Sequence, residues 1–268
     1  GADSLGDPYF PELGGGGIDV QAYDLDLDIA GDGSRIDGTA TLTLTATEDL
    51  ASFSLDLIGL DVASVTVDGD DAAVERADRE LRIRPAEPVP DGATVTVVVT
   101  YGGEPRAVPT ESLGPIGWIV LPRGGGSYVI GEPEGAATWF PANDHPTDKA
   151  TFRFELSVPP GVEALANGEL VAHDETTWVW SMDDPMATYL AQVVVGQYRL
   201  TEEQGPDGVV IRNAFPEGFG EEIGLAFARQ GQMIEHFASL FGPYPFDVYG
   251  STVIDASIGL AFESQTLS

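Results

Sequence analysis

Hydrophobic and polar residues alternate along residues 18–200 with the two-residue period of strands that bury one face. The clearest run places Tyr23, Leu25, Leu27 and Ile29 between Asp24, Asp26 and Asp28. Shorter runs of the same kind follow at residues 40–46, 53–57, 65–67, 81–83, 95–101 and 152–158. Many short strands separated by turn signals are typical of an antiparallel sandwich or of large open sheets. We therefore predict a mainly β protein, with a β domain over residues 18–200.

Two dipeptides in this region have the composition of tight hairpin turns. They are Asp68-Gly69 and Asn167-Gly168. Each combines a residue that tolerates a left-handed backbone with glycine, as two-residue hairpin turns require. We predict that each dipeptide joins two paired strands.

The pattern changes near residue 201. Residues 209–213 resemble a strand, and between Gly220 and Phe241 apolar residues recur at steps of three and four, which is typical of one helix. The stripe consists of Ile223, Phe227, Gln230, Ile234, Phe237 and Phe241. Gly242-Pro243 is a helix stop, and strand patterns follow at 248–254 and 258–267. Because the chain stops at Ser268 within strand-like sequence, we expect it to be part of a longer polypeptide.

The net charge of the chain excludes some classes of function. The 268 residues include 44 acidic and 12 basic ones, for a net charge of −32. A protein of this charge is not expected to bind nucleic acid or an anionic membrane through a basic surface. No apolar run approaches the roughly 20 residues that span a bilayer. The acidity is spread along the chain, which indicates a solvated surface; adaptation to high salt, or a field that attracts an amine-bearing substrate, are the alternatives.

The absence of cysteine excludes disulfides and thiolate metal ligands. The N-terminus has neither the basic stretch nor the apolar core of a signal peptide, and Gly14 to Gly17 suggest that residues 1–17 form a flexible lead-in. A mature exported protein would begin this way, and so would a trimmed chain. With its high acidity and a single lysine, we expect an extracellular or cell-envelope location.

The residues alone offer no self-contained catalytic constellation. The three histidines, His145, His173 and His236, are far apart in the sequence. There is no HExxH, no nucleophile elbow of the form G-x-S-x-G, and no phosphate-binding glycine loop.

Two stretches carry a resemblance to a known family. The first reads GEPEGAATWFPANDHPTDKATF over residues 131–152, and the second comprises GPYPF at 242–246 and GLAFESQT at 259–266. Ala-Asn-Gly at 166–168 and Tyr-Leu-Ala at 189–191 match in the same order. Together they resemble the aminopeptidase N family of zinc metallopeptidases, the gluzincins, over nearly all of residues 18–268. The resemblance implies a saddle-like N-terminal β domain at 18–200 and the α+β opening of a thermolysin-like catalytic domain at 201–268.

The resemblance also implies substrate-binding residues. Glu132 matches the position that receives the free α-amine of a peptide substrate, and Glu263 matches the glutamate of the exopeptidase motif, which holds the same amine. Leu260, Ala261 and Phe262 fall on that motif's strand. The backbone of Ala261 and Phe262 is expected to pair with the extended substrate, and the Phe262 ring to wall the pocket for its first residue. On an alternating strand, Glu263 should face opposite to Phe262.

Several positions depart from the family pattern. Leu260 replaces the first glycine of the exopeptidase motif, and Ser264 replaces its asparagine. Ala137 stands where the first stretch has arginine, and His145 where it has glutamate. These changes bear on how closely a substrate approaches the backbone of the motif and on which substrates are preferred. They bear less on the assignment to the family. A pair formed by Asp144 and Lys149 is expected to be structural.

Catalysis in the family requires HExxH and a glutamate 18 residues further on, which hold zinc and activate water. We expect these groups beyond Ser268, in the remaining catalytic domain of the same polypeptide. The chain by itself is therefore expected to bind no zinc, to contain no catalytic residue and to be inactive. A zinc aminopeptidase that removes N-terminal residues from peptides is the leading interpretation.

Two alternatives stay open. One is a non-catalytic β-sandwich module that binds carbohydrate or protein, with a sugar-stacking surface formed by Trp118, Trp139, Trp178 and Trp180. Trp178 and Trp180 share one strand face with apolar neighbours, which favours core packing instead. The other is a member of the same family with altered or lost peptidase activity, such as a relative that hydrolyses epoxides.

Overall fold

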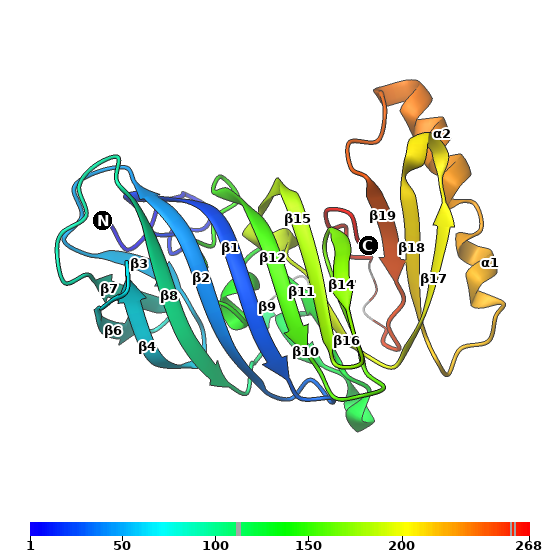
Figure 1. The fold of residues 1–268 in the computed structure, drawn as a ribbon, viewed down its shortest axis with the longest axis horizontal. Helices are drawn as coiled ribbons and strands as arrows, with labels where there is room; N and C mark the ends of the chain where they lie inside the picture. The colour runs from blue at the N-terminus through cyan, green and yellow to red at the C-terminus, as the bar shows by residue number, and fades with distance from the viewer. Residues whose placement is uncertain (111–113, 258, 260) are drawn as a thin grey trace.

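Eight strands form the largest sheet of the protein, which runs across the view in Figure 1. The computed structural model describes residues 1–110, 114–257, 259 and 261–268. In spatial order the strands are β14 (Glu169–His173), β15 (Thr177–Ala187), β12 (Lys149–Ser157), β1 (Ile18–Ile29), β2 (Ile36–Ala46), β8 (Thr94–Gly103), β4 (Asp61–Val67) and β5 (Asp70–Asp71). The pairs are antiparallel except β1 with β12, which is parallel.

Two smaller sheets complete the β domain. The first contains β13 (Glu163–Ala166), β16 (Val193–Gly196), β11 (Ser127–Ile130), β10 (Gly114–Val120) and β9 (Val108–Thr110). The second contains β3 (Phe53–Asp56), β7 (Glu80–Arg84) and β6 (Ala73–Ala77). Short 3-10 helices η1 (Pro122–Gly124), η2 (Ala136–Thr138), η3 (Thr188–Leu190) and η4 (Pro206–Gly208) lie in the connections. The inward faces of the three sheets share one hydrophobic core.

The alternating pattern has the expected consequence in β1. The apolar residues Tyr23, Leu25, Leu27 and Ile29 are fully buried, whereas Asp26 and Asp28 are exposed. Burial of every second side chain is the main stabilising contribution of such a strand, at about 1.5–3 kcal/mol for each large apolar side chain. The prediction of a mainly β protein is confirmed.

The four tryptophans belong to this core. Trp118, Trp139, Trp178 and Trp180 are all buried. The indole nitrogens of Trp118 and Trp180 donate hydrogen bonds to the carbonyls of Gly33 and Ala164. A sugar-stacking surface requires exposed ring faces, so these residues do not provide one.

A fourth sheet follows at the right of Figure 1 and carries the helices. It comprises β17 (Tyr198–Gln204), β18 (Val210–Pro216) and β19 (Val248–Thr252). β18 and β19 are parallel, and the crossover between them contains α1 (Ile223–Phe227) and α2 (Gln230–Phe241). Among the described residues, no helix is long and apolar enough to cross a membrane.

The single helix predicted for residues 220–241 is two helices, because its halves are anchored differently. The ring of Phe227 in α1 forms a T-shaped pair with that of Phe215 of β18, with ring centroids 5.4 Å apart. Gln230, the polar exception on the stripe, begins α2 and is buried in hydrogen bonds to Asn213 and Ser251. α2 ends at Phe241, and Gly242 adopts a φ of 97°, as the stop signal predicted.

The apolar stripe of α2 is only partly covered. Ile234 packs against Val209 and Ile211, whereas Phe237 is 55% exposed and Phe241 is 82% exposed. Beside them lies a groove with a volume of about 610 Å³, whose apolar lining includes Met233, Phe237, Phe241, Tyr244 and Pro245. Contiguous exposed apolar surface of this kind is typical of an interaction face.

The two hairpin predictions have opposite outcomes. Asp68 and Gly69 have φ values of 50° and 87° and join β4 to β5, as predicted. Asn167-Gly168 does not close a hairpin, since β13 pairs with β16 in one sheet and β14 with β15 in another. The dipeptide instead connects two sheets, because the neighbouring strands find their partners further along the chain.

Two further expectations change. The strand predicted at 258–267 is not formed in its described part, residues 259 and 261–267; only Ser268 is joined to β19, through backbone hydrogen bonds with Gly250 and Thr252.

Residues 1–17 are not a free lead-in throughout. Leu13 is buried, and the amides of Gly14 and Gly15 donate to Asp56 and Asn143.

Candidate functional site

Glu132 lies on the turn that connects β11 to η2. Its side chain is exposed. The turn is closed by a hydrogen bond of 2.6 Å from the amide of Gly135 to the carbonyl of Gly131. At Gly131 the turn meets residue 189 so closely that an added Cβ would lie 2.0 Å from the Tyr189 carbonyl oxygen. The position of Glu132 is therefore tied to the segment that begins at residue 189.

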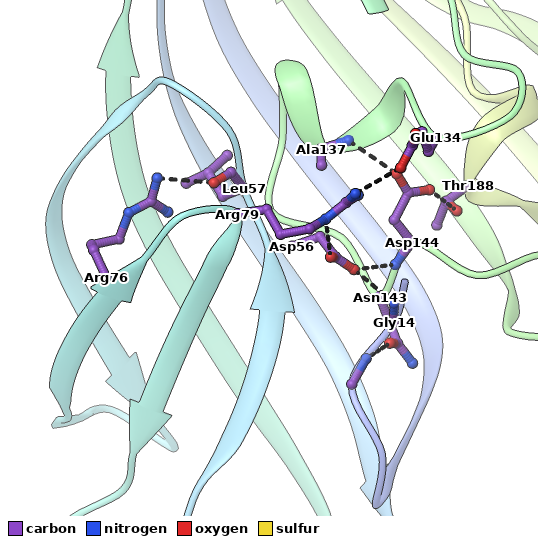
Figure 2. A network of polar contacts seen from close by, with 11 residues as sticks. Gly14, Asp56, Leu57, Arg76, Arg79, Glu134, Ala137, Asn143, Asp144 and Thr188 are labelled. Carbon is purple, nitrogen blue, oxygen red and sulfur yellow. Dashed lines mark hydrogen bonds and ion pairs between the residues drawn. The ribbon is translucent and has the colours of Figure 1, made fainter. Parts of the chain in front are cut away.

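A polar network contacts the same turn at Glu134 (Figure 2). Arg79, in the connection between β6 and β7, donates from Nη1 to Glu134 Oε2 at 2.7 Å and from Nε to Asp56 Oδ1 at 2.8 Å. The other oxygen of Asp56 accepts hydrogen bonds from the amides of Gly14 and Asp144. One guanidinium thus connects the turn of Glu132 with the core carboxylate of β3.

Asp144 extends this network to residue 188. Its carboxylate accepts a hydrogen bond of 2.8 Å from Thr188 Oγ1 and another, of 3.3 Å, from the amide of Ala137. Burial raises the pKa of Asp144 to about 7, and the charge of Asp56 adds to this shift. Burial also raises the pKa of Asp56, against the opposing charge of Arg79.

The expected pair of Asp144 and Lys149 is wrong. Asp144 is buried and uses the partners just described, whereas Lys149 is exposed at the start of β12. The sequence reasoning missed Arg79, which is 23 residues from Asp56 and 55 from Glu134. The sequence contained a partial signal for such a pair. A buried carboxylate needs a cation as its partner, the chain has only twelve basic residues, and position 137 is alanine where the family pattern has arginine.

Glu263 lies in the segment of residues 261–268, which has no regular secondary structure. Its side chain is exposed, whereas that of Phe262 is buried in the core. The segment is held by side chains. The Ser264 hydroxyl donates to the Leu190 carbonyl, and Asn167 Nδ2 donates to Ser264 Oγ at 2.8 Å and to the Gln265 carbonyl at 2.7 Å.

The two candidate carboxylates are connected through one short segment. Gly131 precedes Glu132 and lies against Tyr189. Ser264 follows Glu263 and donates a hydrogen bond to the Leu190 carbonyl. Within the described part of the chain, neither glutamate has a hydrogen bond or ion pair to another residue. Two exposed carboxylates without a protein partner, whose neighbours Gly131 and Ser264 contact adjacent residues of one segment, suit a cationic ligand. Their binding of an amine stays a prediction.

A cavity of about 260 Å³ lies beside this segment. Residues far apart in the sequence line it, among them Tyr128, Ile130, Gln192, Phe227, Thr252, Ala261 and Phe262. Phe262 thus walls a mainly apolar cavity. Gln192 Oε1 and Thr252 Oγ1 are buried there without a hydrogen-bond partner among the described residues. Leu260, the remaining predicted site residue, lies outside the described residues.

The histidines are dispersed. His145 is buried, with Nδ1 2.7 Å from Thr147 Oγ1. His173 stacks on Trp178 with ring centroids 4.9 Å apart, and His236 is exposed on α2. Over residues 1–110, 114–257, 259 and 261–268, no group of three histidine, cysteine, aspartate or glutamate side chains is placed to hold a metal ion. These residues therefore do not fit a zinc site.

Comparison with known proteins gives concordant results. Residues 20–190 match the family model described as the peptidase M1 N-terminal domain. Aminopeptidase N of Streptomyces lividans is 23% identical over 246 residues, which are 87% of this chain and 28% of that protein. Aminopeptidase M1 of Arabidopsis thaliana is 31% identical over 119 residues, which are 42% of this chain and 14% of that protein. The chain thus spans less than a third of these relatives.

Solved structures cover more of the chain. An M1 zinc metallopeptidase mutant of Deinococcus radiodurans, bound to a Tyr-Ser-Ala substrate, superposes with a TM-score of 0.91 at 29% identity. The match covers 98% of this chain and 62% of that one. A two-domain M1 zinc metallopeptidase mutant bound to L-arginine superposes with a TM-score of 0.87 at 29% identity, over 95% of this chain and 60% of that one. The likeness therefore includes the sheet of β17, β18 and β19 and the two helices.

Proposed function

Because this chain belongs to the peptidase M1 family, we propose that it forms the front part of a zinc-dependent aminopeptidase that removes N-terminal residues from peptides. The observation that carries the proposal is the likeness to an M1 zinc metallopeptidase over 98% of the chain. In this proposal residues 18–200 are the N-terminal β domain, and residues 201–268 begin a thermolysin-like catalytic domain.

The chain would contribute the recognition of the substrate's amino group. A protonated α-amine is bound best by carboxylates in a partly dry cleft, where an ion pair is stronger than in water. Glu132 and Glu263 are exposed, and their neighbours Gly131 and Ser264 contact adjacent residues of one segment, which supports this role. Fixing the amine positions the first peptide bond and restricts cleavage to the end of the chain. The net charge of −32 attracts a cationic substrate as well.

The zinc ligands and the general base are assigned to polypeptide outside this chain, since the chain covers 62% of the M1 zinc metallopeptidase that it resembles. When bound, zinc would polarise the scissile carbonyl and lower the pKa of a water molecule. No step is assigned to the histidines of this chain. The exposed apolar residues of α2, Phe237 and Phe241 among them, suit contact with the rest of such a catalytic domain.

The test uses the complete polypeptide that contains this chain. We expect it to hydrolyse an aminoacyl 4-nitroanilide but not the same compound with an acetylated amine. Replacing either carboxylate, as Glu132→Gln or Glu263→Gln, should raise KM by roughly 10- to 100-fold, the equivalent of one charged hydrogen bond. Glu75→Gln, at an exposed glutamate of β6, is the matched control. Equal hydrolysis of the acetylated compound would exclude aminopeptidase activity. An unchanged KM in both variants would exclude a role of Glu132 and Glu263 in binding the amine.

A further inference from the structure

Asn167 is a fully buried side chain in the connection between β13 and β14. All of its polar groups are in use. Nδ2 donates to the Ser264 hydroxyl and to the Gln265 carbonyl, and Oδ1 accepts a hydrogen bond of 2.6 Å from the amide of Gln192. A single amide therefore joins three separate segments of the chain.

These segments are the ones that carry the proposed amine site. Ser264 and Gln265 directly follow Glu263, and the Ser264 hydroxyl also bonds to the carbonyl of Leu190. Gln192 follows Tyr189 by three residues, and Tyr189 packs against the turn of Glu132 at Gly131. Asn167 thus closes a ring of hydrogen bonds between the segment of Glu263 and the segment that supports Glu132.

The segment of Glu263 depends on such ties. It has no strand partner in its described part, and its backbone is joined to β19 only at Ser268. The neighbouring Gly168 adds a hydrogen bond of 2.8 Å from its amide to Thr266 Oγ1, and Thr266 adopts a left-handed φ of 69°. Hydrogen bonds from the Asn167-Gly168 connection therefore help to fix residues 264–266, together with the bonds from Ser264 to the Leu190 carbonyl and from Gln265 Nε2 to the Asp184 carbonyl.

We propose that Asn167 is a positioning residue for Glu263, which sets the location of that carboxylate relative to Glu132. The inference rests on the proposed function, since it assumes that Glu263 binds the substrate amine. Asn167 touches neither glutamate and acts through Ser264 and Gln265. A purely structural role would stabilise the same connection without affecting amine binding, so the test must separate the two roles.

A double-mutant cycle in the complete polypeptide makes this separation. Asn167→Ala is combined with Glu263→Gln, and kcat and KM are measured with an aminoacyl 4-nitroanilide. We expect Asn167→Ala to raise KM about tenfold, as for the loss of two ordinary hydrogen bonds, with a smaller change in kcat. In the Glu263→Gln background the same substitution should change KM by less than twofold, because the carboxylate that it positions is already absent.

The matched control is Asn213→Ala, which removes another buried, fully bonded asparagine that contacts neither Ser264 nor Gln265. Its effect should multiply with that of Glu263→Gln. Ser264→Ala removes one tie without a large cavity and repeats the cycle if Asn167→Ala does not fold. Hydrogen exchange of residues 263–266 should quicken in Asn167→Ala and Ser264→Ala, but not in Asn213→Ala.

The outcomes distinguish the inference from the proposed function. The positioning role is refuted if Asn167→Ala leaves KM unchanged, or if its effect on KM multiplies fully with that of Glu263→Gln. Amine binding by Glu263 would stand in both cases. If Glu263→Gln has no effect on KM, amine binding by Glu263 fails and the positioning role fails with it. In that case faster exchange in Asn167→Ala would leave the hydrogen-bonded tie as a structural feature only.

Discussion

Replacing Arg79 with methionine tests whether the buried network beside the candidate site is an ion pair. The Arg79 side chain is 13% exposed and that of Asp56 is 1% exposed. Methionine retains much of the apolar stem and removes the guanidinium, so packing changes less than charge. The substitution leaves the Asp56 carboxylate buried with the amides of Gly14 and Asp144 as its remaining donors.

The expected loss follows from that geometry. Removing one partner of a buried ion pair costs about 3–5 kcal/mol, because an uncompensated charge is left behind. Two backbone amides still solvate Asp56, so we expect a loss near the lower value, about 3 kcal/mol at pH 8. The matched control is Arg82→Met. Arg82 pairs with Asp3, and both side chains are more than 40% exposed, so this substitution should cost much less stability than Arg79→Met.

The loss should also depend on pH in a defined direction. Burial raises the pKa of Asp56 even when Arg79 is present, and removal of Arg79 raises it further. The folded Arg79→Met variant then binds a proton more readily than the unfolded chain, so its stability falls as pH rises through that pKa. Relative to the parent chain, the variant should lose more stability at pH 8 than at pH 5.

Urea unfolding followed by tryptophan fluorescence measures the effect, since the four tryptophans are buried in the folded state. The parent chain, Arg79→Met and Arg82→Met would be compared at pH 5 and pH 8. A loss below 1 kcal/mol at pH 8, a loss equal to that of the control, or a loss that does not change with pH would refute the buried ion pair.

Two further substitutions test other parts of the structure. Burial raises the pKa of Asp144 from 3.8 to about 7, so this carboxyl should make the protein less stable as pH rises between these values. Asp144→Asn should therefore flatten the dependence of the urea midpoint on pH over that range. An unaltered slope would show that Asp144 is not the responsible group. Gly168→Ala would place a Cβ 1.9 Å from the Ser181 carbonyl oxygen at a φ of 85°, whereas Gly69→Ala has a similar φ of 87° and free space. We expect about 1–2 kcal/mol of strain in both variants and an additional 1–3 kcal/mol in Gly168→Ala, measured by thermal unfolding; equal losses would argue against the close approach.

The sequence was most informative where structure depends on near neighbours. Alternation at Tyr23, Leu25 and Leu27 predicted a strand with one buried face, because successive side chains of a strand point to opposite sides. The positive φ of Gly242 and of Asp68-Gly69 likewise follows from the local preference of these residues for a left-handed backbone. Glu132 and Glu263 were found in another way, through the resemblance, since a lone exposed carboxylate carries no pattern of its own.

Tertiary structure decided what depends on residues far apart in the chain. Asn167-Gly168 has the composition of a hairpin, yet its flanking strands pair with β16 and β15 in different sheets. The Arg79 pair with Asp56, and the tie from Asn167 to Ser264 across 97 residues, leave no spacing signal. Local periodicity records which face of a segment avoids water, whereas the partner of a buried polar group is set by packing that brings distant segments together.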